Sequence, residues 1–356
     1  MTSLHKRVLK GFIKQSPAAD SAIGTMDINI RSRLKYSLKR PFSFEIDIVD
    51  SCNLRCVHCP RGVYYQTSTS TRMELDVFKR LLDKITSECR CRKIELFNWS
   101  EPFLHPELDQ FVKVVKSKKI ECVLSSNLSF NNPARLEAVL MHSPSLIVSV
   151  SGFTQAMHER YHKGSNLETV KGNLKFIADL KKARRLSLHV RIHCLQFVDN
   201  KYDQLLWKQF CDDYGFVYQG TPAYSSEVST PETAKRLLIQ PGFYRDSDGK
   251  EKIEMYFSEN PSFEACSLHN TIPINVHGDV YLCCIYWIRE KYKIDNYFDA
   301  SLISIQEKRL MHRHCSHCMV SRNKESVIAK LAKLGNKVAS RQLGHKVGKG
   351  LKKLLK

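Results

Sequence analysis

The chain has 356 residues, and its 56 Lys and Arg against 36 Asp and Glu give a formal charge of +20. Hydrophobic residues make up 42% and charged residues 26%, a balance that excludes a wholly disordered chain. No stretch approaches ~18 uncharged apolar residues, so no transmembrane helix is predicted. The N-terminus lacks the apolar core and cleavage site of a secretory signal, so we expect a cytoplasmic protein.

Positive charge is concentrated at the two ends of the chain. Residues 1–40 carry a net charge of +7 and residues 324–356 a net charge of +9, so the body is only mildly basic. In the C-terminal tail, apolar residues recur at helical spacing among Lys and Arg. This pattern is typical of an amphipathic helix on an anionic membrane, here the inner membrane surface, or against an acidic partner. A solvated tail is the alternative, because four glycines weaken a helix there; contact with nucleic acid is the least favoured interpretation.

Strand-like and helix-like segments alternate between residues 43 and 224. Strands are predicted at 43–51, 93–100, 121–128, 146–152, 186–197 and 216–224. Helices are predicted between them at 73–86, 105–119, 133–142, 166–185 and 203–214. Six such repeats indicate an α/β fold, a partial (β/α)6 parallel barrel that binds ligands at the carboxyl ends of its strands.

The pattern stops after about residue 225, which divides the chain into five parts. We expect a small cysteine-rich metal-cluster domain to follow the barrel, because short elements and cysteines replace the β/α repeats there. The predicted parts are a basic N-terminal extension (1–40), the partial barrel (41–225), a linker (226–252), the small domain (253–323) and the basic tail (324–356).

Three of the 13 cysteines directly follow the first predicted strand. Cys52, Cys56 and Cys59 form a C-x3-C-x2-C motif at the mouth of the barrel. Three thiolates can hold three irons of a [4Fe–4S] cluster and leave the fourth iron open to a ligand. The alternatives are a zinc site, which normally needs four protein ligands or three and a water, and three unrelated cysteines.

In this position the motif resembles the signature of the radical S-adenosylmethionine (SAM) superfamily, over about residues 41–225. His58 occupies the usually aromatic position close to the adenine. The resemblance implies that the open iron binds the amino and carboxylate groups of SAM. It further implies that one electron from the cluster cleaves the S–C5′ bond, and that the 5′-deoxyadenosyl radical takes a hydrogen atom from the substrate.

Polar residues after the next three strands add to this resemblance. Many members have Gly-Gly-Glu-Pro after strand 2, where this chain has Trp-Ser-Glu-Pro; Ser100 and Glu101 are therefore assigned to SAM, with Glu101 facing its ammonium. The alternative is that Glu101 only provides a charge at a helix N-terminus. Asn127 and Ser149 occupy the corresponding positions after strands 3 and 4, although the acid that often follows such a serine is missing.

The fifth predicted strand places polar and apolar residues on opposite faces. His189, Arg191 and His193 alternate with apolar residues, which predicts that the polar face looks into the barrel. Arg191 is a candidate for binding a carboxylate of SAM or substrate, and Arg191 and His193 are the candidate catalytic residues. Alternatively, each of these side chains has a structural role and forms its hydrogen bonds within the protein.

Four further cysteines form a second set in residues 253–323. Their positions are Cys266, Cys283, Cys315 and Cys318. The segment 271–284 predicts a hairpin with its turn at His277–Asp279. The spacing resembles the SPASM/twitch domains that follow radical SAM barrels, which implies a fully ligated auxiliary [4Fe–4S] cluster for electron transfer. Zinc or no metal are the alternatives, and Cys284 is either a bystander or a competing ligand.

Together these patterns predict a radical SAM oxidoreductase that dehydrogenates a sugar-like or other polar small molecule. Its expected cofactors are SAM and two [4Fe–4S] clusters, and its expected electron donor is a flavodoxin or ferredoxin. One alternative is a radical SAM maturase that modifies peptides. A second, from a different class, is a zinc-stabilised protein that binds nucleic acid or membranes.

Overall fold

The computed structural model describes residues 33–57, 59, 61–62, 71–197, 200–222, 269–284 and 290–312. The chain divides into two units. The larger comprises Ser37–Tyr256 and Leu268–Lys308, and the other comprises Met1–Tyr36, Phe257–Ser267 and Arg309–Lys356. The larger unit holds the strands of the described chain. Within the described residues, the helices are too short or too polar to cross a membrane.

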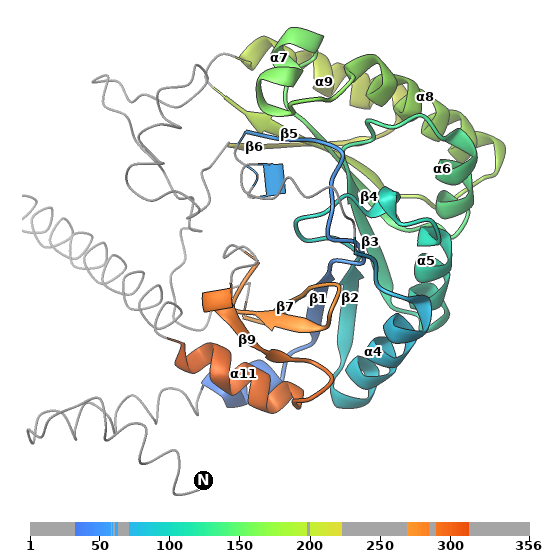
Figure 1. Ribbon diagram of the computed structural model, residues 1–356. Coiled ribbons are helices and arrows are strands. Elements are labelled where there is room, and N and C mark those ends of the chain that lie inside the picture. The colour runs from blue at the N-terminus through green and yellow to red at the C-terminus, as the bar shows by residue number, and fades with distance from the viewer. Residues whose placement is uncertain are drawn as a thin grey trace, which may run out of the picture. The chain divides into compact units, whose positions relative to one another are not determined.

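Six parallel strands lie side by side in the order in which they occur along the chain. They are β1 (Phe42–Ile46), β2 (Cys91–Glu95), β3 (Glu121–Ser126), β4 (Ser145–Val150), β5 (Val190–Gln196) and β6 (Val217–Pro222). The connecting helices are α4 (Leu75–Glu88), α5 (Leu108–Ser117), α6 (Pro133–Leu140), α7 (Gln155–Tyr161), α8 (Leu167–Ala183) and α9 (Lys201–Tyr214). These helices cover the outer face of the curved sheet (Figure 1). Among the described strands β1 and β6 do not pair, so the barrel is partial, as predicted.

Three more strands extend the sheet beyond β1. Strand β7 (Thr271–Ile274) pairs in parallel with β1, and β8 (Asp279–Tyr281) and β9 (Lys293–Asn296) follow it in antiparallel pairs. Gly278, with φ of +83°, completes the β7–β8 turn, which confirms the predicted hairpin. The short helices η1 (Pro102–Leu104) and η2 (Glu290–Tyr292) and the helix α11 (Leu302–Met311) complete the described elements.

The alternation of side chains along each strand places the core between sheet and helices. On β5, Val190, Ile192 and Cys194 are buried while Arg191 and His193 are partly exposed, which confirms the predicted polar inner face. The connecting helices α4, α5, α6, α8 and α9 pack apolar side chains against the outer face; α4 buries four large side chains in this way. The carboxyl ends of the strands therefore remain available for a ligand site.

The first strand is shorter than its sequence suggests. The predicted strand 43–51 ends at Ile46, although the apolar pattern continues. Residues 48–50 turn away and pair with 71–73 through an isolated bridge between Val49 and Arg72. This pairing closes the base of the loop that carries the three cysteines.

Candidate active site

The loop after β1 is held against the segment that follows α7. The N–H of Arg55 donates to the carbonyl of Lys163 at 2.9 Å, and the N–H of Val57 donates to the carbonyl of Tyr161 at 3.0 Å. Gly62 lies so close to the loop that an added Cβ would stand 2.5 Å from the carbonyl oxygen of Cys56. Only glycine fits there, and the backbone around Cys56 is therefore tightly packed.

The three cysteines are half-buried, and weak donors contact the sulfur of Cys52. The Cys52 sulfur accepts from the N–H of Leu54 at 3.4 Å and from the side chain of Asn127 at 3.8 Å. Burial and the neighbouring Glu101 raise the pKa of Cys52 to about 12, and burial together with the other two thiols raises that of Cys56. Such thiols lose their protons when a metal supplies positive charge.

This donor set suits an iron–sulfur cluster. In a [4Fe–4S] cluster each thiolate binds a different iron, so the sulfurs surround the cluster without meeting at one point. Within the described residues, no three His, Cys, Asp or Glu side chains are grouped as a single metal ion would require. The three sulfur donors and their position in a cavity at the carboxyl ends of the strands fit the cluster predicted from their spacing.

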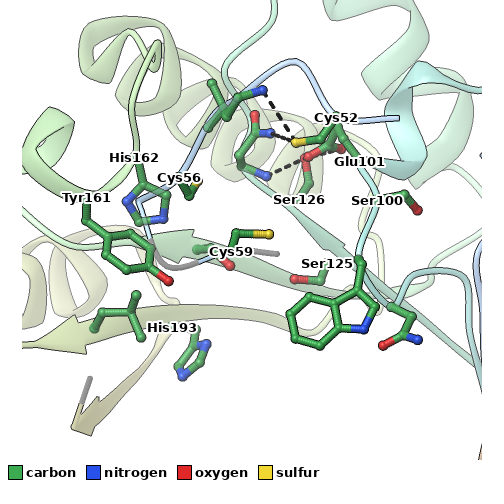
Figure 2. A pocket seen from close by; sticks show the side chains of 16 residues that line it. Cys52, Cys56, Cys59, Ser100, Glu101, Ser125, Ser126, Tyr161, His162 and His193 are labelled. Atoms are coloured by element: carbon green, nitrogen blue, oxygen red, sulfur yellow. Dashed lines mark hydrogen bonds between the residues drawn. The ribbon is translucent and has the colours of Figure 1, made fainter. Parts of the chain in front are cut away.

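The thiols open into a cavity of about 260 Å³ at the carboxyl ends of β1–β5. Figure 2 shows Cys52 beside Glu101 on one side of this cavity, and Cys56 beside His162 on the other. The predicted residues Ser100, Glu101, Asn127, Ser149 and His193 all line it. Residues that the sequence did not single out for SAM also line it, among them Trp99, Ser126, Tyr161 and His162.

Glu101 is almost completely buried at the edge of this cavity. One carboxylate oxygen accepts from the hydroxyl of Ser126 at 2.8 Å and the N–H of Phe103 at 3.2 Å; the other accepts from the N–H of Asn127 at 2.8 Å. Burial outweighs these hydrogen bonds and raises the pKa of Glu101 to about 7. A cationic ligand group would stabilise the ionised carboxylate, which is the role predicted for the SAM ammonium.

Asp47 is a buried carboxylate that sequence reasoning missed. It stands just beyond β1 and accepts hydrogen bonds from the N–H groups of Asn98 at 2.9 Å and Trp99 at 3.1 Å, and from the hydroxyl of Ser100. Where many radical SAM sequences have two glycines, this chain has Trp99 and Ser100. Asp47 therefore fixes the loop that carries Glu101. Burial raises the pKa of Asp47, opposed first by the hydrogen bond from Ser100.

The side chain of Asn127 links the third strand to the cysteine loop. Its amide donates to the side-chain oxygen of Asn53 at 2.9 Å, in addition to the contact with Cys52. Its oxygen accepts from the N–H of Ser129 at 2.8 Å. Asn127 is thus committed to holding the loop as well as lining the cavity, whereas Ser149 on β4 lines it without a hydrogen bond within the described chain.

The two candidate residues of β5 lie in different surroundings. His193 lines the cavity, and burial followed by the charge of Arg191 lowers its pKa. Arg191 lies two residues earlier, is not among the lining residues, and donates to the side chain of Gln219 on β6 at 3.0 Å. The structure therefore brings His193 to the cysteine cavity and leaves Arg191 deeper along the strand.

Only part of the second cysteine set can be placed. Cys283 follows β8 with Cys284, and both lie near the buried carboxyl group of Glu45 on β1. Burial, Glu95 and Cys283 raise the pKa of Glu45 to about 8. The remaining predicted residues, His58, Cys266, Cys315 and Cys318, lie outside the described residues, so the auxiliary cluster stays a prediction.

A model of a known protein family matches the part of the chain that builds this site. Residues 46–194 match the model of the radical SAM superfamily. The match contains the three cysteines and Glu101 and ends in β5. Residues 46–194 are therefore similar to radical SAM domains. The radical SAM family implies SAM and a [4Fe–4S] cluster as cofactors, and the cysteine spacing predicted the cluster. No curated protein sequence matches the chain.

Solved structures have a similar fold over most of this chain, including residues outside the part that matches the family model. SuiB of Streptococcus suis, bound to the precursor peptide SuiA, has a TM-score of 0.58 and 12% identity, over 83% of this chain and 72% of that chain. The protein anSMEcpe, with bound AdoMet and the Cp18Cys peptide, has a TM-score of 0.54 and 14% identity, over 78% of this chain and 82% of that chain. At these identities the likeness concerns the fold.

Proposed function

We propose that the protein is a radical SAM oxidoreductase that removes a hydrogen atom from a polar small molecule and completes a two-electron oxidation. The observation that carries this proposal is the single cavity lined by Cys52, Cys56, Cys59 and Glu101. When bound, the [4Fe–4S] cluster and SAM would supply a 5′-deoxyadenosyl radical, which takes one hydrogen atom from the substrate and becomes 5′-deoxyadenosine.

Residues of the cavity would bind SAM and accept the proton that the substrate loses. Glu101 would bind the SAM ammonium, and Ser100 and Asn127 would hold the loops around it. Completing the oxidation requires the substrate to lose a second electron and a proton. His193 is the proposed proton acceptor because its imidazole lines the cavity and, within the described residues, has no hydrogen-bond partner. Arg191 stays a candidate for binding a substrate carboxylate.

The second electron is proposed to leave through an auxiliary [4Fe–4S] cluster held by Cys266, Cys283, Cys315 and Cys318. This part rests on their spacing and its resemblance to SPASM/twitch domains. The reductant for the first cluster would be a flavodoxin or ferredoxin. The basic ends of the chain are proposed to contact an anionic membrane surface or an acidic partner.

A second candidate is the modification of a peptide. Two structures with TM-scores above 0.5, SuiB with SuiA and anSMEcpe with Cp18Cys, were obtained with bound peptides. The same radical chemistry would then act on a peptide side chain. The compounds that increase 5′-deoxyadenosine formation distinguish the two candidate functions. Polyols and sugar derivatives should do so in the first case, and peptides in the second.

The proposal is tested by iron analysis of the anaerobically reconstituted full chain. Two clusters predict about eight irons per chain, and the variant with Cys315→Ala and Cys318→Ala should retain about four. That variant should still cleave SAM abortively but fail to turn over substrate. About four irons together with bound zinc in the unaltered chain would remove the auxiliary electron relay and favour a redox-neutral reaction. Normal turnover by the variant would contradict the relay as well.

A further inference from the structure

His162 is held in a fixed position against the cysteine loop. It directly follows α7, its N–H donates to the carbonyl of His158 at 3.0 Å, and its own carbonyl accepts from the N–H of Ser165 at 3.0 Å. The carbonyls on either side of it, those of Tyr161 and Lys163, accept from the cysteine loop. His162 as a whole is 3% exposed, and it lines the cavity.

Ser151 determines which nitrogen of this imidazole carries the proton. Its hydroxyl lies 3.1 Å from the carbonyl oxygen of His158 and 2.9 Å from Nδ1 of His162. A carbonyl oxygen can only accept, so the one hydroxyl proton is donated to His158. The hydroxyl then accepts from Nδ1–H of His162, and a neutral ring in this tautomer has its lone pair on Nε2.

The packing around the ring favours its neutral form. The imidazole of His158 stacks on that of His162, with centroids 4.6 Å apart and planes 11° apart. Burial, then His158 and His193, lower the pKa of His162 well below its usual value. Two stacked, buried imidazolium ions would repel each other without solvent to screen them. Nε2 therefore remains an acceptor that, within the described residues, receives no hydrogen bond.

The arrangement of the cavity indicates which ligand group would meet this acceptor. Glu101 and Cys52 lie on one side and His162 and Cys56 on the other (Figure 2). If Glu101 binds the ammonium end of SAM, the nucleoside end extends away from Glu101. We propose that Nε2 of His162 accepts a hydrogen bond from a neutral donor of the SAM nucleoside, a ribose hydroxyl or the adenine amino group. This assignment rests on the proposed function.

Binding of SAM to the reconstituted full chain tests the assignment. His162→Phe removes the acceptor and should raise the dissociation constant for SAM about fivefold to tenfold. His162→Gln can present an amide oxygen near the position of Nε2 and should retain most of the affinity. His142→Phe, at a histidine outside the cavity, is the matched control and should leave the affinity unchanged.

Analogues of SAM distinguish the two donors. Forms that lack the 2′-hydroxyl, the 3′-hydroxyl or the adenine amino group are compared in binding to the unaltered chain and to His162→Phe. The analogue that lacks the partner donor should bind both proteins equally. Unchanged affinity for SAM in His162→Phe, at unchanged iron content, would overturn the assignment alone. A chain that holds its cluster but binds no SAM would overturn the proposed function together with it.

The tautomer provides a readout that depends on neither activity nor the cluster. Nitrogen-15 NMR of the cluster-free full chain with ring-labelled histidines, assigned by the His162→Gln variant, should show the proton of His162 on Nδ1. A proton on Nε2 would overturn the assignment, because that nitrogen could then only donate. This measurement remains decisive even if His162→Phe fails to fold.

Discussion

The two sides of the cavity lined by Cys52, Cys56 and Cys59 differ in how many hydrogen bonds their polar side chains form. On the side built by β1–β3, the carboxylates of Asp47 and Glu101 together accept hydrogen bonds from four loop N–H groups and two hydroxyls. On the side built by β4 and β5, the imidazole of His193 has no hydrogen-bond partner within the described residues, and that of His162 has one only at Nδ1. The first side is fixed by its own chain, whereas the second presents acceptors to a ligand.

This difference separates two tasks that one cavity must perform. The hydrogen-bonded side resists reorganisation, which suits a cofactor that must sit in one geometry at an open iron. The side with unbonded imidazole nitrogens can contact the nucleoside and accept a proton from a substrate. The following predictions test this division, in order of decreasing expected effect.

Removing all three loop thiols should eliminate the cluster, and with it the function of both sides. The variant with Cys52→Ala, Cys56→Ala and Cys59→Ala should lose about four irons per chain and all SAM cleavage, because no other described thiols line the cavity. Iron analysis after anaerobic reconstitution measures this effect. Cys91→Ala, at a half-buried thiol elsewhere in the sheet, should keep the iron content of the unaltered chain. A triple variant that retains its iron would exclude this loop as the cluster site.

Replacing Glu101 by Gln should damage the hydrogen-bonded side specifically. The amide cannot attract an ammonium by charge, and its NH2 group would oppose at least one of the donors from Phe103, Ser126 and Asn127. We expect the dissociation constant for SAM to rise about tenfold to a hundredfold. Equilibrium dialysis measures it, with the exposed Glu107→Gln as the control. Unchanged affinity would place the ammonium elsewhere.

Replacing Gly152 by Ala should disturb the side formed by β4 and β5. An added Cβ would stand 2.3 Å from the backbone nitrogen of His158, so α7 must shift together with Tyr161 and His162. We expect a loss of about 1–3 kcal/mol in the free energy of unfolding, measured with urea on the cluster-free chain. Gly172→Ala is the control: in α8 its Cβ meets no atom within 4 Å, so it should stabilise by up to about 1 kcal/mol. Equal effects of the two variants would contradict the close packing at Gly152.

The affinity for SAM should depend on pH through Glu101. Burial raises its pKa to about 7, so below that pH the SAM-free carboxyl group takes up a proton and loses the charge that attracts the ammonium. The dissociation constant should therefore rise as the pH falls below about 7, by up to about tenfold per pH unit. The Glu101→Gln variant should lack this dependence. A dissociation constant that falls on acidification would contradict the role of Glu101.

Local patterns predicted the partial barrel, and they singled out the cysteines and Glu101 that the structure brings to one cavity. The spacing of Cys52, Cys56 and Cys59 and the position of Glu101 are features of neighbouring residues, so the sequence displays them directly. The burial of alternate residues on β5 likewise follows from a period of two.

The features that were missed depend on contacts between distant residues. Asp47 resembles any polar residue of an alternating strand until the loop at Asn98–Ser100 folds onto it. The pairing of β7 with β1 joins segments more than two hundred residues apart, and no local pattern specifies it. The role proposed for His162 depends on Ser151 and on stacking with His158, and no local pattern displays these contacts.

The most direct test of the account is the formation of 5′-deoxyadenosine by the anaerobically reconstituted full chain, supplied with SAM and dithionite and analysed by chromatography. We expect 5′-deoxyadenosine from the unaltered chain and none above background from the variant that lacks Cys52, Cys56 and Cys59. A chain that binds about four irons or more yet forms no 5′-deoxyadenosine, or forms as much as the variant does, would contradict it.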